Sequence, residues 1–144
     1  MSFRASDYCV SVVALEKNNN KYGMTCAWFM QVDYDKILCL LGAQSTTGQI
    51  IEKNDLVGVS ILSKNQKDIA LALGENHSNE VDKFMNINIH NEANALLIPN
   101  ASRHMICKVI DVVHLPEIEE DNLLYLRVLK TAENNEDFLH YSDL

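Results

Sequence analysis

The sequence predicts a mainly β protein, an antiparallel barrel with short helices at its periphery. Short β-branched or apolar runs recur along the chain, and short polar turns rather than helices join the first of them. The 144 residues suit one domain, and 47% of them are hydrophobic, which is enough for a core. No repeat or linker-like stretch divides the chain, so residues 1–144 form one predicted domain.

The N-terminal part of the chain predicts a series of hairpin-linked strands. Residues 9–15 form a β-branched run, and the Asn-rich turn at 17–21 leads back into a second strand at 23–32. After a turn at 34–35, the apolar run 37–42 ends at a glycine, which is typical of a buried strand.

Two short helices are predicted in the middle of the chain, with a strand at 56–62 between them. Ser45 is a candidate N-cap for the first helix, and Ser63 is a candidate N-cap for the second, over 65–73. The polar, Asn-rich segment 75–94 is predicted to be the least regular part of the chain.

The C-terminal part predicts the strands that complete the barrel. An apolar run at 95–98 stops at Pro99, and long strands are predicted at 104–115 and 123–131 with an acidic turn between them. Residues 132–144 are acidic and are expected to form a tail or a dimer arm.

Composition and spacing exclude several classes of function. The formal net charge of −8 argues against nucleic acid or an anionic membrane as a partner. No apolar run approaches the roughly 20 residues of a membrane span, and the N-terminus lacks signal-peptide features, so a cytoplasmic location is expected. The histidines have no metal-binding spacing, and no metal site is expected. The cysteines form no CxxC pair and are predicted to be reduced, buried thiols: Cys9, Cys26, Cys39 and Cys107.

The small residues from Gly23 to Ala27 form the first candidate binding element. Small side chains at the start of a strand would let a flat ligand approach the main chain and its N–H groups. Trp28, the only tryptophan, could stack on such a ligand or equally well fill the core. Cys26 could be a reactive thiol, but a buried structural thiol is favoured because no basic residue lies near it in sequence.

Two further clusters are candidates for binding. The hydroxyls of Ser45, Thr46 and Thr47 stand at a predicted helix N-terminus, where free N–H groups favour a phosphate; the alternative is a simple cap with the threonines facing water. Lys83 and Phe84 stand in a charged and aromatic cluster of the polar segment; the alternative is a Phe anchor beside a solvated Lys.

Taken together, these segments resemble the flavin reductase-like family, whose fold is the FMN-binding split barrel. YGMTCAWF is similar to the NGMTxSW segment of that family, LGAQSTTGQII to its Ser-and-Thr pattern before a short helix, and NEVDKF to its Asp-Lys-Phe loop. VGVSILSKNQKDIA and ALLIPNASRHMICKVIDVV match further strands in the same order, so the resemblance covers about residues 8–131. It implies an antiparallel split β-barrel with FMN near the interface of a homodimer.

The resemblance also implies which residues bind FMN. The segment around Thr25 would lie along the isoalloxazine ring, the hydroxyls near Thr47 would bind the phosphate, Ser60 and Leu62 would flank the flavin, and Lys83 and Phe84 would add charge and apolar cover. The complete predicted set is Met24, Thr25, Cys26, Ala27, Trp28, Ser45, Thr46, Thr47, Ser60, Leu62, Lys83 and Phe84.

The implied function is hydride or electron transfer through bound FMN, with NADH or NADPH as the donor. No catalytic side chain is predicted, because hydride chemistry belongs to the flavin. The chain departs from the family pattern at Tyr22 and Ser60, where Asn is common, and residues 119–128 lack the His and Gly of a Gly-Asp-His motif that bears on nicotinamide binding. Two alternatives therefore stay open: an FMN electron carrier without a nicotinamide site, paired with another redox protein, and a cofactor-free split-barrel dimer.

Overall fold

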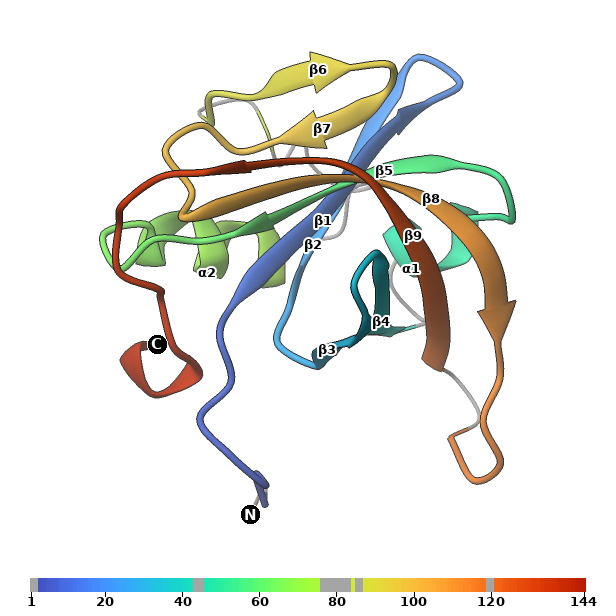
Figure 1. Cartoon of the computed structure of the whole chain (residues 1–144), viewed down its shortest axis with the longest axis horizontal. Helices are drawn as coiled ribbons and strands as arrows, with labels where there is room; N and C mark the ends of the chain where they lie inside the picture. The colour runs from blue at the N-terminus through green and yellow to red at the C-terminus, as the bar shows by residue number, and fades with distance from the viewer. Residues whose placement is uncertain (1–2, 43–45, 76–83, 85–86, 119–120) are drawn as a thin grey trace.

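The computed structural model describes residues 3–42, 46–75, 84, 87–118 and 121–144. These residues form a strongly curled antiparallel sheet, with two short helices outside it (Figure 1). The predicted mainly β, antiparallel fold with peripheral helices is confirmed. The elements in chain order are β1 (Ser11–Lys17), β2 (Asn20–Cys26), β3 (Phe29–Asp33), β4 (Lys36–Gly42), α1 (Thr46–Ile50), β5 (Leu56–Ile61), α2 (Lys67–Glu75), β6 (His90–Glu92), β7 (Ala95–Leu97), β8 (Arg103–Val113), β9 (Asp121–Glu133) and the 3₁₀ helix η1 (Tyr141–Asp143).

β1 is the central strand of its part of the sheet, because it pairs with β2, β5 and β7. The neighbouring strands follow the order β3-β4-β9-β8-β5-β1-β7-β6, and β2 also pairs with β1. The β1–β2 hairpin has the predicted Asn-rich turn: Asn18 and Asn19 have φ of 54° and 65°, the left-handed conformation that a two-residue hairpin turn requires and that Asn tolerates.

The predicted strand at 23–32 is wrong as one element, because it consists of two strands. β2 pairs with β1, whereas β3 pairs with β4, so the chain changes partner at Ala27 and Trp28. At this point the Leu40 N–H donates to the carbonyl oxygen of Trp28 at 2.9 Å. Local β propensity runs through both strands, and only the pairing partners separate them.

The segments that were predicted to be irregular contain order. Part of 75–94 lies outside the described residues, but its end forms β6, which pairs with β7 across a turn at Ala93 and Asn94. The C-terminal segment is not a free tail: Leu139 is completely buried and bonds through its backbone to Val10 and Leu62, both at 2.9 Å. Apolar Phe138 and Leu139 anchor this acidic segment to its own chain.

The start of the second helix also differs from the prediction. α2 begins at Lys67, and the Ser63 hydroxyl donates to the Asn65 side chain at 2.8 Å instead of capping the helix. The side-chain oxygen of Gln66 accepts from the Ser63 N–H at 3.0 Å. The Gln66 side chain therefore bonds back to Ser63, which lies before the helix, and the predicted serine cap is wrong.

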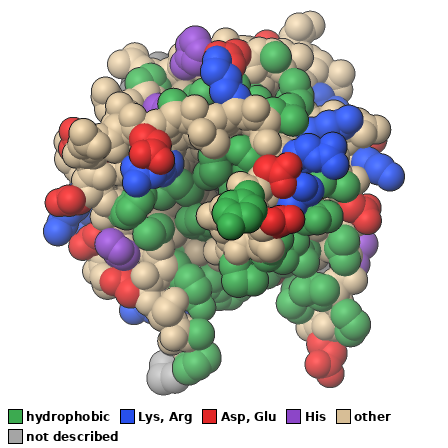
Figure 2. All heavy atoms as spheres, viewed as in Figure 1, with side chains coloured by type: hydrophobic (Ala, Val, Ile, Leu, Met, Phe, Trp, Pro, Cys, Tyr) green, Lys and Arg blue, Asp and Glu red, His purple; other side chains and the backbone are tan. Residues whose placement is uncertain are grey.

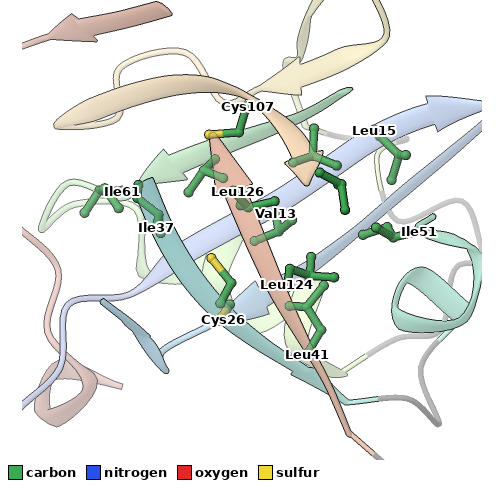
Figure 3. Close-up of a cluster of buried hydrophobic side chains, with 14 residues drawn as sticks. Val13, Leu15, Cys26, Ile37, Leu41, Ile51, Ile61, Cys107, Leu124 and Leu126 are labelled. Carbon is green, nitrogen blue, oxygen red and sulfur yellow. The ribbon is translucent and has the colours of Figure 1, made fainter. Parts of the chain in front are cut away.

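The core has two layers, and β1 supplies both. Val13 and Leu15 point into the barrel, where they pack with residues such as Leu124 and Cys26 (Figure 3). The alternate residues of β1, including Val12, join a second cluster that also contains α2 residues. Strand residues point alternately to opposite faces of a sheet, so an apolar run such as CVSVVAL can serve two buried layers.

Candidate functional site

β2 presents its predicted binding residues to both faces of the sheet. Met24 and Cys26 pack with the barrel core, whereas Thr25, on the opposite face, donates from Oγ1 to the Ala70 carbonyl oxygen of α2 at 2.5 Å. Ala27 is half-buried. Because these side chains alternate between the two faces, a flat ligand on either face would contact the main chain and only every second side chain of this segment.

Ser60 and Leu62 lie two strands away from β2. Val12 of β1 pairs with Thr25 on one side and with Ser60 on the other, so the three residues form one row across the sheet. Both Ser60 and Leu62 are completely buried. The Ser60 hydroxyl accepts from the Ile98 N–H at 2.9 Å, so within the described fold it serves to join β5 to the end of β7.

Phe84 closes over the start of the β2 segment. Its side chain is buried, and a Cβ added at Gly23 would lie 2.6 Å from the Phe84 Cζ. The structure therefore explains Gly23 by the close approach of an aromatic ring. Trp28 is 53% exposed, so the interpretation of this tryptophan as a core residue is wrong, and its indole is available at the break between β2 and β3.

α1 lies beside β2 and contains two residues of the predicted hydroxyl cluster, Thr46 and Thr47. Thr46 begins this helix, while Ser45 and Lys83 lie outside the described residues. Thr47 is 1% exposed, and its Oγ1 has no hydrogen-bond partner within the described part of the chain. The interpretation of Thr47 as a water-facing residue is therefore wrong. A buried hydroxyl without a partner is costly, which makes Thr47 the predicted residue with the clearest need for a ligand.

Asn122 is a polar residue at this site that the sequence analysis did not select. It stands at the start of β9, is 8% exposed, and donates from Nδ2 to the Gly48 carbonyl oxygen at 2.9 Å. The only signal in the sequence is one polar amide directly before the apolar run LLYL. That signal is weak, because many strands begin with such a residue.

A cavity of about 450 Å³ lies apart from the predicted binding residues of β2 and α1. It lies between the β6–β7 hairpin and the paired strands β8 and β9, with an apolar floor that includes Leu97 and Ile106. The Lys130 ammonium and the Glu92 carboxylate, 3.1 Å apart, stand among its lining groups. None of its lining residues belongs to the predicted binding set.

Apolar side chains lie exposed on β3 and near it. The exposed fractions are 59% for Met30, 43% for Val32 and 98% for Tyr34, and β3 is an edge strand whose only described partner is β4. Figure 2 shows apolar side chains gathered over the lower middle of the face where Figure 1 draws β3 and β4. Exposed apolar groups on an edge strand are unfavourable in an isolated chain.

The four cysteines are free, and three of them are buried. Burial raises the pKa of Cys107 to about 12, so this thiol stays protonated at neutral pH. For Cys9, which is partly exposed, burial and the charge of Asp7 also raise the pKa. The interpretation of Cys26 as a buried structural thiol agrees with its 4% exposure.

We expect native protein at pH 8 to react slowly with an aromatic disulfide reagent. The reason is that only Cys9 is partly accessible and its pKa is raised, while the other three thiols are enclosed. The measurement is the rate of thiol release with and without denaturant, and Cys9→Ser is the control that should abolish the native signal. Rapid labelling of two or more thiols in the native protein would contradict this arrangement.

Neither membrane-spanning helices nor metal-binding clusters occur in what the structure describes. No described helix is long and apolar enough to cross a membrane. Within the described ranges, no three His, Cys, Asp or Glu residues are placed to hold a metal ion.

Comparison with known proteins agrees with this fold. The sequence matches the family described as flavin reductase like domain over residues 3–143, whereas no curated protein matches. The NADH:FAD oxidoreductase SgcE6 of Streptomyces globisporus C-1027 is similar in structure, with a TM-score of 0.81 and 18% identity over 92% of this chain and 80% of that one. The flavin reductase PheA2 has a TM-score of 0.78 and 21% identity, covering 92% of this chain and 84% of its own. An FMN-binding protein from Thermus thermophilus, with bound p-hydroxybenzaldehyde, has a TM-score of 0.81 and 17% identity, covering 94% and 82%.

Proposed function

The chain belongs to the flavin reductase-like family, and on this premise we propose that it is an FMN-dependent oxidoreductase that accepts electrons from NADH or NADPH. The observation that carries the proposal is the family match over residues 3–143, which includes every strand of the sheet. The similar solved structures include proteins whose names specify flavin reductase and NADH:FAD oxidoreductase activity, which supports the same reaction class.

The described residues fit a flavin mononucleotide. The buried, unpartnered Thr47 hydroxyl is suited to donate a hydrogen bond to a phosphate, which is a strong acceptor. The resemblance places the ring of the flavin along Met24 to Ala27, where the exposed Trp28 could cover it at the β2–β3 break. Bound FMN supplies hydride acceptance, while the chain positions the ring and excludes water.

The proposed roles divide between main chain and side chains. N–H groups near Thr25 and Cys26 would stabilise negative charge that develops on a ring held beside them. Thr25 itself is fixed by its bond to Ala70, so α2 keeps this part of β2 in place. Phe84 covers Gly23 and shields the same segment from water.

We also propose that the active form is a homodimer with β3 in its interface. The exposed Met30 and Val32 project from one face of this edge strand, and Tyr34 follows directly. A second copy of the chain would bury these groups and protect the strand edge from other partners. The free and largely buried thiols suit a reducing compartment. We therefore propose that the protein is located in the cytoplasm.

The test of the function is a visible spectrum followed by anaerobic reduction. The protein is expected to bind FMN and show the absorbance band of bound flavin, and stoichiometric NADH or NADPH should then bleach it. A protein that neither carries flavin nor binds added FMN would overturn the proposal. Protein heated to release flavin and then mixed with fresh FMN is the control for cofactor loss during purification.

Two observations favour an FMN electron carrier as the second candidate. Asn122 stands in the region where the family shows a histidine that bears on nicotinamide binding, and the net charge of −8 suits docking to a basic redox protein. In that case FMN binds, but neither NADH nor NADPH bleaches it. Reduction by a reduced redox protein, with the same final spectrum, would then identify the carrier.

A further inference from the structure

Two buried oxygen atoms near the start of α1 lack a hydrogen-bond partner within the described residues. They are Thr47 Oγ1 and Asn122 Oδ1, and neither has a hydrogen bond within the described residues. The two side chains are 1% and 8% exposed. Asn122 donates from Nδ2 to the carbonyl oxygen of Gly48, the residue that follows Thr47, so a side chain of β9 is tied to the same helical turn.

The pairing of the strands explains why these residues come together. Asn122 is opposite Leu41, and Asp121 is opposite Gly42, the last residue of β4. The start of β9 therefore lies along the end of β4, and α1 follows β4 in the chain. The distant strand β9 thus brings the Asn122 amide to the helical turn that carries Thr47.

Chemistry determines which atom of Asn122 lacks a partner. The Gly48 carbonyl oxygen can only accept a hydrogen bond, so the amide nitrogen must face it at 2.9 Å. An amide turned the other way would bring two acceptors together. The unpartnered atom is therefore an acceptor, and it needs a donor, whereas the Thr47 hydroxyl can donate to an acceptor.

We propose that Asn122 is a further flavin-binding residue, which accepts a hydrogen bond from a ribityl hydroxyl of FMN while Thr47 donates to the phosphate. The inference rests on the proposed function. FMN carries hydroxyl donors directly next to an anionic acceptor, and the protein offers an acceptor on Asn122 and a donor on Thr47, the residue before the one to which Asn122 is bonded. Through its bond to Gly48, Asn122 also positions the helical turn that carries Thr47.

The physical consequence is that the unpartnered atoms lower the stability of the flavin-free protein and raise its affinity for flavin. A buried polar atom without a partner destabilises the flavin-free fold, and bound flavin removes that penalty. Removal of the Thr47 hydroxyl should therefore harm binding without harming the empty protein. Removal of a hydroxyl that is already bonded inside the fold should instead destabilise the empty protein and leave flavin binding unchanged.

The experiment compares Thr47→Val and Asn122→Leu, two variants of similar shape to the native residues, with Ser102→Ala as the matched control. Ser102 is completely buried, and its hydroxyl donates to Glu136 O at 2.9 Å. The measurements are Tm without flavin and Kd for FMN and for riboflavin, which has the ribityl chain but no phosphate. Thermal melting needs no activity, so it reports on the empty site directly.

For Thr47→Val we expect an unchanged or higher Tm, a Kd for FMN raised about tenfold or more, and an unchanged Kd for riboflavin. For Asn122→Leu we expect the Kd of both flavins to rise by the same factor, about tenfold. Ser102→Ala should lower Tm and leave both Kd values unchanged. Asn122→Ala, which also removes the acceptor, replaces Asn122→Leu with the same expected result if that variant does not fold.

Two outcomes would overturn the inference, and they can be told apart. If the native protein binds FMN and both variants bind it equally tightly, water or the two side chains themselves satisfy these atoms, and only the inference fails. If the native protein does not bind FMN at all, the proposed function fails with it.

Discussion

Gly58→Ala is expected to destabilise the fold by about 3 kcal/mol or more, because the added methyl group would overlap with main chain. A Cβ at this position would lie 2.1 Å from the Leu96 carbonyl oxygen and 2.7 Å from its carbonyl carbon. Gly58 is held by β1 and β8 on its two sides, opposite Ala14 and Ile106, so it cannot move away from β7 without breaking a ladder. The measurement is the urea midpoint of unfolding, or the soluble yield if the variant does not fold.

Gly23→Ala is the control for Gly58→Ala. Its Cβ would lie 2.6 Å from Phe84 Cζ, which is the far end of a side chain that can rotate or shift. We expect a smaller loss, about 1 kcal/mol, since a ring yields more easily than main chain. Equal urea midpoints for Gly58→Ala and the native protein would show that the Leu96 main chain does not lie against Gly58 as described.

The double variant Met30→Glu and Val32→Glu is expected to convert the proposed homodimer into a monomer. Each copy would place two carboxylates in the interface, so a twofold contact would bury four unpaired charges, in a protein whose net charge is already −8. We expect the dimer Kd to rise at least about 100-fold, the equivalent of roughly 2.7 kcal/mol. Sedimentation velocity across a concentration series measures this change.

Leu115→Glu is the control for the β3 variant. Leu115 is 39% exposed and lies between β8 and β9, outside β3, so the dimer should survive this substitution. The flavin content of the β3 variant should fall together with the dimer, because the family resemblance places FMN near the subunit interface. A native protein that is monomeric at every concentration would contradict the homodimer, and an intact dimer in the double variant would exclude β3 from its interface.

The sequence predicts well wherever local chemistry decides the conformation. The hairpin between β1 and β2 follows from an Asn-rich turn between two strand-forming runs, and Asn tolerates the left-handed backbone found there. The glycine that ends the apolar run at 37–42 also ends β4. The order of motifs along the chain resembled the family, and the family match over residues 3–143 confirms it.

Prediction fails where distant parts of the chain compete for the same residues. The run 23–32 contains enough strand-forming residues for one long strand, but β1 and β4 pair with different halves of it. In the same way, an acidic composition predicts a solvated tail, while Leu139 finds a buried position between Val10 and Leu62. These pairing partners lie far away in sequence, so the local sequence around each segment does not reveal them.

From the sequence alone came the antiparallel β class and the membership of a flavin reductase-like family. Only the tertiary structure showed that Ser60 is bonded within the fold, that Trp28 is exposed, and that Asn122 is bonded to Gly48, next to Thr47. The physical reason is that a side chain's environment depends on strand register, since a shift of one residue would move it to the opposite face. Local propensity does not determine register; the packing of the whole sheet does.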